Sequence, residues 1–259
     1  MSPFLARRRP ELVEWMDRED CDPVRLQNTY RHFARVNRWI SRWEAVYRRH
    51  IRPLLGPDRT TRLLDVGAGG GDIAWSLHHL AQRDGFHLEV TGIDPDPRAL
   101  AFARSRLDGE ESEGTRARRV TFRQARTGDL VREGARFHLV TCNHVLHHLS
   151  PKALPAFLEE LEELATLRVI CSDIERSRLG YLLFSVATAP FFRDSFIRSD
   201  GLLSIRKSFT RAELRDVLPP GWRVERQMPF RLLALRDMGA ELGKGDGTGD
   251  RTEGRGDPR

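Results

Sequence analysis

Residues 62–72 read RLLDVGAGGGD, and this stretch decides the fold class of the chain. An apolar strand-like run ends in Asp65 and passes directly into Gly67, Gly69 and Gly71. Glycine has no Cβ, so the turn can adopt positive φ and let the backbone approach a ligand closely. A helix-like run, IAWSLHHLAQR, follows, and the free N–H groups of its first turn would point to the same place. The stretch predicts a strand, a ligand-binding turn and a helix, although a turn that binds nothing would have the same sequence pattern.

A second acidic residue follows the glycine turn at an informative distance. Residues 88–94 read LEVTGID and predict a second buried strand that ends in Asp94, followed by a helix with Pro97 near its first turn. In a doubly wound sheet, the carboxylate at the tip of the second strand lies beside the ribose of a bound nucleotide. We therefore assign Asp94 to ribose binding. The alternative is a charge at a turn or helix terminus, a role that Asp96 can also fill.

The glycine spacing distinguishes between two nucleotide-binding families. The third glycine comes one residue earlier than in the G-x-G-x-x-G motif of NAD enzymes. The spacing matches D-x-G-x-G-x-G, and the region resembles the class I S-adenosylmethionine (SAM) methyltransferases. The resemblance implies S-adenosyl-L-methionine as the cofactor. The residues that it places around the cofactor are Asp65, Gly67, Gly69, Gly71 and Asp94.

Length and composition indicate one domain with extensions. A chain of 259 residues with 39% hydrophobic content can bury one substantial core. No apolar run is long enough to span a membrane, and the N-terminal residues lack the apolar core of a signal peptide. Three scattered cysteines are too few for a disulfide framework, and Cys142 and Cys171 are expected as buried thiols. These features predict a cytoplasmic enzyme.

The positive charge of the chain is dispersed. The formal net charge is +6, yet the lysines are only Lys152, Lys207 and Lys244, and the arginines alternate with acids along the chain. A nucleic-acid-binding protein usually gathers its cations in a patch or stripe, so we expect no nucleic acid partner. Two alternatives remain open. One is an RNA-binding or RNA-modifying protein with a methyltransferase fold, and the other is a SAM-binding domain without catalytic activity.

Three parts can be distinguished along the chain. Residues 1–53 have a helical pattern, in which Asp22 and Pro23 form a cap-and-start pair, and are predicted to form an N-terminal helical cap. Residues 54–238 alternate strand and helix patterns and form the predicted methyltransferase domain. Residues 239–259 contain almost nothing that can enter a core and are predicted to be disordered. The residues that recur at three- and four-residue steps in the helical pattern are Leu26, Tyr30, Phe33, Asn37, Ile40, Trp43 and Tyr47.

The strand patterns predict a Rossmann-like α/β fold with a seven-stranded, mostly parallel sheet and helices on both faces. The last two strands are close enough in the sequence to form a hairpin. The resemblance to class I methyltransferases implies that the final strand is antiparallel. The strands are expected at residues 62–66, 88–93, 119–124, 137–142, 167–172, 222–227 and 230–236.

Two positions depart from the pattern of the family. An acid or asparagine near the adenine amine usually follows the third strand, but this chain has Arg126 there and Asp129 three residues later. A frequent Phe-Asp pair before the fourth strand reads Phe137-His138. Either the alignment shifts locally, or backbone and apolar contacts hold the adenine.

The segment NHVLHHLSP at 143–151 follows the fourth strand, where this fold exposes its reaction centre. Asn143 is a candidate contact for the methionine part of SAM or for the substrate. Because imidazole is well suited to proton removal near neutral pH, His144 and His147 are candidate catalytic bases. The alternative is that the histidines of this segment are packed or solvated helix residues. No metal site is predicted, since a fourth ligand is not in sight.

An apolar insertion at 173–209 suggests a hydrophobic methyl acceptor. Arg176, Arg178 and Arg206 are candidates to orient a polar head group, or are simply solvated. The residues that could line a cavity, or only pack a helical lid, are Tyr181, Leu182, Phe184, Phe191, Phe192, Phe196 and Ile197.

A second resemblance concerns the acceptor. The stretch YRHFARVNRWISRWEAVYRR resembles the leading segment of ubiquinone/menaquinone-biosynthesis C-methyltransferases. The whole chain also resembles bacterial methyltransferases associated with type III polyketide synthases, which modify alkylated phenols. These resemblances imply a small lipophilic phenol or quinol as acceptor and leave oxygen or carbon methylation open. The arginine-faced helix of this stretch could also contact a membrane surface, or simply pack. The oligomeric state is not predicted.

Overall fold

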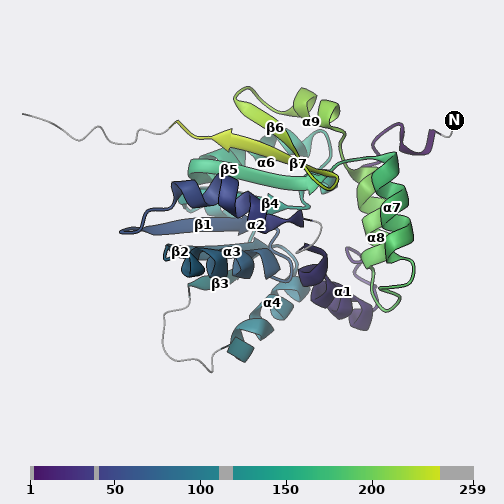
Figure 1. The fold of residues 1–259 in the computed structure, drawn as a ribbon, viewed down its shortest axis with the longest axis horizontal. Helices are drawn as coiled ribbons and strands as arrows, with labels where there is room; N and C mark the ends of the chain where they lie inside the picture. Colours follow the sequence, from purple (N-terminus) through teal and green to yellow (C-terminus); the bar gives the residue numbers. More distant parts are fainter. Residues whose placement is uncertain (1–2, 38–40, 111–118, 240–259) are drawn as a thin grey trace, which may run out of the picture.

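The computed structural model describes residues 3–37, 41–110 and 119–239. These residues form a seven-stranded sheet in the order β3-β2-β1-β4-β5-β7-β6 (Figure 1). The sheet is parallel apart from β7, which runs antiparallel between β5 and β6. The strands are β1 (Thr60–Val66), β2 (His87–Asp94), β3 (Val120–Gln124), β4 (Phe137–Asn143), β5 (Ala165–Ile174), β6 (Trp222–Gln227) and β7 (Arg231–Asp237).

The predicted fold class and the closing hairpin are confirmed. Each strand overlaps its expected range, because runs of β-branched and other apolar residues bounded by turns are typical of buried strands. The helices outside the N-terminal part are α3 (Asp72–Arg83), α4 (Pro97–Glu110), α5 (Thr127–Arg132), α6 (Ala153–Leu164), α7 (Arg178–Thr188), α8 (Ile197–Lys207) and α9 (Arg211–Val217).

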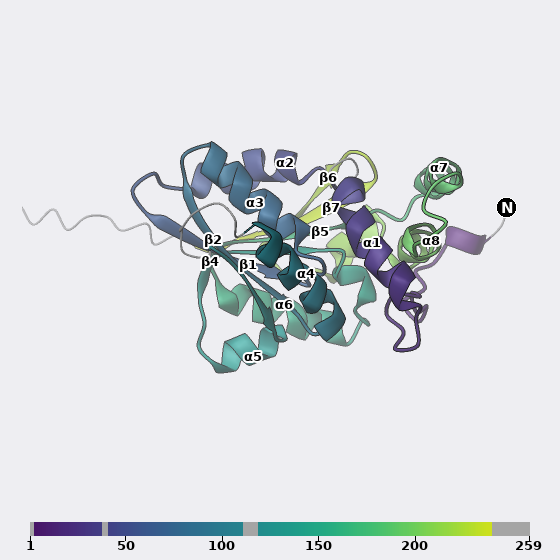
Figure 2. The same ribbon diagram turned by 90° about the horizontal axis from the view of Figure 1, so that it is seen from below.

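Two hydrophobic cores fill the spaces between the sheet and the helices. The adjacent residues Leu63 and Leu64 illustrate the division, because successive side chains of a strand point to opposite faces. Leu63 belongs to the core that includes Leu77 of α3. Leu64 belongs to the core that includes Leu158 of α6. Helices therefore cover both faces of the sheet, as Figure 2 shows for α3 on one side and α5 on the other.

The strand order reverses between β1 and β4, which lie next to each other in parallel register. From β1 the chain continues to β2 and β3, which lie on one side of β1 within the sheet. It then returns to β4, which lies on the other side of β1. In open α/β sheets, ligands bind outside the carboxyl ends of the strands at such a reversal. This topology directs the search for a site to the residues that follow β1, β2, β4 and β5.

After a short 3-10 turn at Pro3–Leu5, the described N-terminal part has no α-helix before Pro23. It contains α1 (Pro23–Val36), α2 (Trp43–Val46), a π-helical turn (Tyr47–Ile51) and a 3-10 turn (Arg52–Leu54). Asp22 Oδ1 accepts hydrogen bonds from the backbone N–H groups of Val24 and Arg25, as an N-cap residue does. The predicted apolar position Ile40 lies outside the described residues.

Residues 6–22 differ from the helical pattern expected for residues 1–53, because they contain turns and bends rather than a regular helix. Their polar groups find partners elsewhere in the fold. Arg8 Nη2 donates to the carbonyl oxygens of His147 and Leu149, at 3.0 and 2.8 Å. Asp200 of α8 accepts the backbone N–H groups of Trp15 and Met16, both at 2.9 Å. Such tertiary hydrogen bonds replace the intrahelical ones.

Helices α7 and α8 lie together beyond the carboxyl ends of the strands, and α7 is the outer of the two (Figures 1 and 2). They occupy the insertion at 173–209 that the sequence predicted. Among the described residues, no helix combines the length and the apolar character needed to cross a membrane. Apart from Gly239, the predicted tail lies outside the described residues, and the domain boundaries of the three-part division stay predictions.

Removing the Asp200 carboxylate is expected to release the segment 6–22. The Asp200→Ala variant leaves two backbone donors without acceptors, each costing about 1–3 kcal/mol. Cleavage of this segment by trypsin should accelerate by about tenfold or more, because local opening becomes more frequent. Asp194→Ala is the matched control, since Asp194 is an exposed residue nearby in the sequence. Equal cleavage rates in the two variants would contradict the conclusion that Asp200 holds residues 6–22 in place.

Candidate active site

A cavity of about 590 Å³ opens at the carboxyl ends of β1, β2, β4 and β5. Its volume lies within the range of about 300–1,000 Å³ that is usual for small-molecule sites. The glycine loop and the ends of the strands form one side, and α7 and α8 form another. Of the predicted site residues, the cavity is lined by Asp65, Gly67, Asp94, Asn143, His144 and His147.

The three glycines of the loop serve different purposes. Gly67, Gly69 and Gly71 all have positive φ, at 69°, 52° and 76°. A Cβ built on Gly71 would lie 2.4 Å from a ring carbon of Phe122, and one on Gly67 would lie 2.7 Å from a methyl group of Val145. A Cβ on Gly69 would meet nothing within 4 Å. Gly67 and Gly71 are therefore required by packing, whereas Gly69 faces open space.

Asp94 fixes the loop in this conformation. Its Oδ2 accepts the backbone N–H of Gly69 at 2.9 Å, and its Oδ1 accepts the N–H of Asp96 at 2.9 Å. Burial raises the pKa of the Asp94 carboxyl, and these two hydrogen bonds oppose the rise. Each carboxylate oxygen has more than one lone pair, so both can accept a further hydrogen bond from a ligand in the cavity.

Asp65 is a buried acid with an unsatisfied oxygen. Its Oδ1 accepts the hydroxyl of Thr141 at 3.0 Å, but its Oδ2 has no hydrogen-bond partner. Burial raises the pKa of Asp65 to about 7, and the negative charges of Asp72 and Asp94 add to the rise. A buried carboxylate without a partner is costly, and a cationic group in the cavity would offset this cost.

A fully buried arginine joins the ends of three strands. Arg231 begins β7, and its Nη2 donates to Asn143 Oδ1 at 2.5 Å and to Ser172 Oγ at 2.7 Å. Its Nη1 donates to His144 Nε2 at 2.5 Å, since a guanidinium can only donate. Burial lowers the pKa of Arg231 to about 10. Burial, and then the adjacent Arg231 charge, hold the pKa of His144 well below its usual value. His144 is therefore a neutral imidazole whose Nε2 is occupied.

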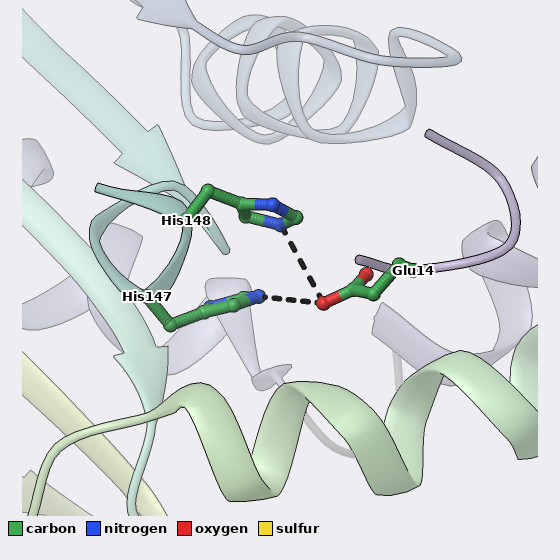
Figure 3. Close-up of side chains that lie close together, drawn as sticks. All are labelled: Glu14, His147 and His148. Carbon is green, nitrogen blue, oxygen red and sulfur yellow. Dashed lines mark ion pairs between the residues drawn. The ribbon is translucent and has the colours of Figure 1, made fainter. Parts of the chain in front are cut away.

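His147 lies between two buried carboxylates. Its Nδ1–H donates to Asp173 Oδ1 at 2.7 Å, and its backbone N–H donates to Asp173 Oδ2 at 2.9 Å. On the other side of the ring, Nε2 is 3.3 Å from Glu14 Oε1 but makes no aligned hydrogen bond (Figure 3). Burial opposes protonation, yet the two carboxylates outweigh it and raise the pKa of His147 to about 9. The imidazole is therefore predominantly protonated at neutral pH.

Glu14 reaches this centre from the N-terminal segment. Its Oε1 accepts hydrogen bonds from Ser204 Oγ at 2.8 Å and from Lys207 Nζ at 3.1 Å. Although burial favours the neutral acid, the histidines and Lys207 hold the pKa of Glu14 well below its usual range. His148 lies on the rim, and its Nε2 is 3.8 Å from the same oxygen (Figure 3). Glu14 is therefore a buried anion that ties the N-terminal segment to the turn after β4 and to α8.

Glu14, His147 and His148 also lie close enough together to be considered as metal ligands. The Lys207 ammonium already provides a positive charge 3.1 Å from Glu14 Oε1. His147, Asp173 and His144 form a second such group, but Nδ1 of His147 is bound to Asp173 and Nε2 of His144 is bound to Arg231. The donor atoms are therefore largely committed to protein partners.

Several residues singled out in the sequence have other roles. Arg176 is buried and donates to the carbonyl oxygens of Leu5 and Ser208, so it is not free to bind an acceptor. The backbone N–H of Arg126 donates to Asp129 Oδ2 at the start of α5, which assigns both to a helix terminus. Nδ1 of His138 accepts the backbone N–H of Arg62.

The predicted aromatic lining is correct in part. Phe184 and Ile197 line the cavity, but Tyr181 and Phe192 do not. Phe196, which directly precedes α8, is buried in a cluster with Leu26 and Tyr30 of the N-terminal helix α1. Leu182 and Phe191 are exposed to solvent.

Four residues of the site were not identified from the sequence: Glu14, Asp173, Lys207 and Arg231. Asp173 and Arg231 had a usable signal, because both lie at the site edge of the sheet, near the carboxyl end of β5 and at the start of β7. Glu14 and Lys207 had none. Their place depends on how the N-terminal segment and α8 fold back over the strands.

Comparison with known proteins agrees with this fold. Residues 63–167 match the family model described as a methyltransferase domain. The matched residues run from β1 to the start of β5 and include the glycine loop, so this part of the chain is a methyltransferase domain. A search of the curated proteins found no match to the sequence.

Solved structures with the same fold include several methyltransferases. The CurJ carbon methyltransferase is 14% identical, with a TM-score of 0.55 over 87% of this chain and 63% of that chain. The PH0226 protein from Pyrococcus horikoshii OT3 is 14% identical, with a TM-score of 0.53 over 82% and 93%. The CMeT domain of the citrinin polyketide synthase is 14% identical, with a TM-score of 0.53 over 76% and 51%. At these identities the likeness concerns the fold alone.

The cofactor of this methyltransferase is SAM, and the cavity has features that suit it. Asp94 has accepting capacity and Asp65 has a buried oxygen without a hydrogen-bond partner, and both line the cavity. Gly69 is not a lining residue, but it donates to Asp94 and leaves open space beside it. SAM carries a sulfonium and an ammonium group, and a buried acid complements such cations. The assignment of individual residues to parts of SAM remains a prediction.

A matched pair of alanine variants separates the packing glycine from the ligand-facing glycine. Gly69→Ala and Gly71→Ala should each lose about 1–2 kcal/mol of stability, because alanine resists positive φ. Gly71→Ala should lose a further 1–3 kcal/mol or so through overlap with Phe122. Only Gly69→Ala places a methyl group in the open space, so its affinity for SAM should fall by about tenfold or more. Calorimetry and thermal unfolding check both, and wild-type SAM affinity in folded Gly69→Ala would contradict the assignment.

Proposed function

We propose that this methyltransferase transfers the methyl group of SAM to a small lipophilic phenol or quinol, with His147 as the residue that takes the acceptor proton. The observation that carries the proposal is the position of His147 Nε2, which lies 3.3 Å from Glu14 Oε1 without an aligned hydrogen bond. This atom belongs to a cavity-lining residue whose other ring nitrogen is fixed by Asp173. A carboxylate that holds one nitrogen in place orients the other for proton exchange with a ligand.

In this proposal, three groups at one end of the cavity hold SAM. Asp65 binds the cationic part, Asp94 accepts hydrogen bonds from ribose hydroxyls, and Gly69 lets the backbone approach closely. Asn143 contributes less than the sequence suggested, because its Oδ1 is occupied by Arg231, and its Nδ2 remains to donate. SAM supplies an electrophilic methyl group on its sulfonium. The chain itself provides orientation and exclusion of water, which contribute much of the acceleration in such displacements.

The other end of the cavity suits a hydrophobic acceptor. Apolar side chains from α7, α8 and the loop before β7 contribute to its lining: Leu183, Phe184, Ile197, Ile205 and Phe230. Their neighbours at the base of the cavity are the polar groups of His147 and Glu14. An aromatic ring with one hydroxyl group matches this division, since the ring can pack on the apolar wall while the hydroxyl approaches the imidazole.

His147 would act through the neutral imidazole. The acceptor O–H gives its proton to Nε2, and the resulting imidazolium is stabilised by Asp173 and Glu14. The phenolate oxygen, or the ring carbon that shares its charge, would then bond to the methyl carbon while the bond from that carbon to the sulfonium sulfur breaks; a methylated ring carbon would afterwards lose its proton to restore the aromatic ring. Because His147 is protonated at neutral pH, turnover by this route requires loss of that proton to solvent before the acceptor binds.

His144 is the weaker candidate for this role. Its Nε2 accepts from Arg231 at 2.5 Å, so its lone pair is occupied. Its low proton affinity, caused by burial and the adjacent guanidinium, also makes it a poor base. We therefore assign His144 to positioning of Arg231 rather than to proton transfer.

The pH dependence of SAM binding tests the role of Asp65. Asp65 must be ionised to attract a cation, and its pKa is raised to about 7 in the free protein. Between about pH 5.5 and 7 the affinity should rise with pH by up to tenfold per unit, then level off, because binding displaces the proton. Asp65→Asn should abolish this slope and weaken binding at pH 7.5 by about tenfold to a few hundredfold. Calorimetry of both proteins checks this, and an unchanged slope in Asp65→Asn would refute the assignment.

The pH profile of turnover tests His147. In the wild type, kcat/KM should rise by about tenfold per pH unit and level near pH 9, where the imidazole becomes neutral. His147→Ala should lower turnover about 10²–10⁴-fold and keep its SAM affinity. The remaining activity should rise further toward the pKa of a phenol, about 10.

A panel of phenols and quinols, with product detection by mass spectrometry, provides the assay. His79→Ala is the control, because His79 is an exposed histidine on α3. Wild-type turnover and pH profile in His147→Ala would overturn the role of His147. Transfer to RNA in place of every phenol and quinol would overturn the proposed acceptor.

A further inference from the structure

Helix α7 exposes a continuous apolar stripe to solvent. Leu179, Leu182, Leu183 and Val186 follow the i, i+3, i+4, i+7 spacing of one helix face, and their exposed fractions are 57%, 59%, 50% and 65%. This spacing places them in one row along the helix. We call these four residues the α7 stripe. Soluble proteins rarely leave a contiguous apolar patch of this kind uncovered unless it binds something.

Two exposed aromatic side chains lie near α7, and one of them is at an end of the stripe. Phe4 is 44% exposed and contacts Tyr181, which lies on a different face of α7 from the stripe, with ring centroids 5.2 Å apart. Phe191 follows the carboxyl end of α7 and is 63% exposed. Aromatic rings at the edge of an apolar surface are typical of proteins that lie at a membrane interface.

The charges around the stripe are positive. Arg178 begins α7 and Arg193 follows it, both are exposed, and the sequence between them contains no charged residue. The Arg206 guanidinium lies over the ring of Phe4, 4.8 Å from its centroid. Two acids flank this stretch in the sequence: Glu175 forms an ion pair with Arg226, and Asp194 is close to the side-chain amide of Asn28. An apolar stripe framed by arginines complements a surface that is apolar inside and anionic outside.

The same helix separates the stripe from the cavity. Gly180, Phe184 and Thr188 of α7 line the cavity, and Leu183 both lines it and belongs to the exposed stripe. Figures 1 and 2 show α7 at the outer edge of the molecule, packed on α8. A molecule that leaves a membrane beneath α7 would therefore need to travel only the width of one helix to reach the cavity.

The N-terminal arginine-faced helix, which the sequence suggested for membrane contact, is less suited to it. Leu26 and Tyr30 of α1 are buried in a cluster with Ala99 and Phe196. The apolar face of α1 is thus occupied by the protein itself, whereas the apolar stripe of α7 is not.

We propose that the α7 stripe docks on an anionic lipid surface and places the cavity next to the membrane from which a lipophilic acceptor enters. The proposal rests on the proposed function only for the nature of this acceptor. The docking itself can be measured without SAM or acceptor, so its failure would leave methyl transfer untouched. A second copy of the chain is the competing occupant of the stripe.

Co-sedimentation of the full chain with vesicles tests the proposal. The protein should bind vesicles of phosphatidylcholine with phosphatidylglycerol, and bind pure phosphatidylcholine vesicles more weakly. Leu182→Glu should lower the partition coefficient by about tenfold or more, because it removes apolar area and adds a like charge to the lipid. Val217→Glu, at an exposed apolar position of α9, should change it less than about twofold.

Two further measurements make the outcome decisive. Arg193→Glu should weaken binding to the anionic vesicles and leave the thermal unfolding temperature unchanged, which covers the case that Leu182→Glu fails to fold. Sedimentation velocity without lipid tests the competing occupant. No binding of the wild type to either vesicle, equal loss in Leu182→Glu and Val217→Glu, or a wild-type dimer that Leu182→Glu dissociates would each overturn the proposal.

Discussion

The arrangement on which the site depends is a protonated imidazole held between two buried carboxylates. His147 donates to Asp173 on one side and faces Glu14 on the other, and all three are almost completely buried. Removing one carboxylate would leave the others as uncompensated buried charges, which is strongly destabilising. The three side chains come from the segment after β4, the end of β5 and the N-terminal segment. These three charged side chains therefore hold the segment after β4 in place and also join the N-terminal segment to the sheet.

The two ends of the cavity are electrostatically different, and this difference suits the two molecules that a methyltransferase must bind. Asp65 and Asp94 make the glycine-loop end acidic, and burial raises the pKa of both. A cationic cofactor would stabilise the ionised forms there. At the other end, apolar walls surround a centre in which Arg231 and Lys207 balance Asp173 and Glu14. This end suits a methyl acceptor that must give up a proton, and it does not suit a cationic ligand.

The sequence predicts the features that depend on local spacing. Strand ranges followed from apolar runs, the glycine loop from its unusual density of glycine, and the hairpin from two short strands close together. The glycine loop also shows what a sequence motif does not reveal, namely the reason that each glycine is required. Gly67 and Gly71 are glycines because Val145 and Phe122 would collide with a Cβ, which the motif alone does not reveal.

Features that depend on long-range folding escaped prediction. Residues 6–22 were included in the predicted helical cap, but Asp200, about 185 residues away, provides acceptors for Trp15 and Met16. Glu14 is placed in the centre by the same contacts. Arg176 seemed free to bind an acceptor because nothing in its neighbourhood of the sequence showed that the carbonyls of Leu5 and Ser208 would meet it. Single-sequence patterns do not contain such pairings.

The most direct test of this account is the titration of the His147 ring, followed by ¹H–¹⁵N correlation spectra from pH 6 to 10 in the wild type and in Glu14→Gln. The account predicts an imidazolium at pH 7 that loses its proton near pH 9 in the wild type. In Glu14→Gln the pKa should be lower, because one of the two carboxylates that favour the charged ring is gone. A neutral His147 at pH 7 in the wild type, or the same pKa in both proteins, would contradict the account.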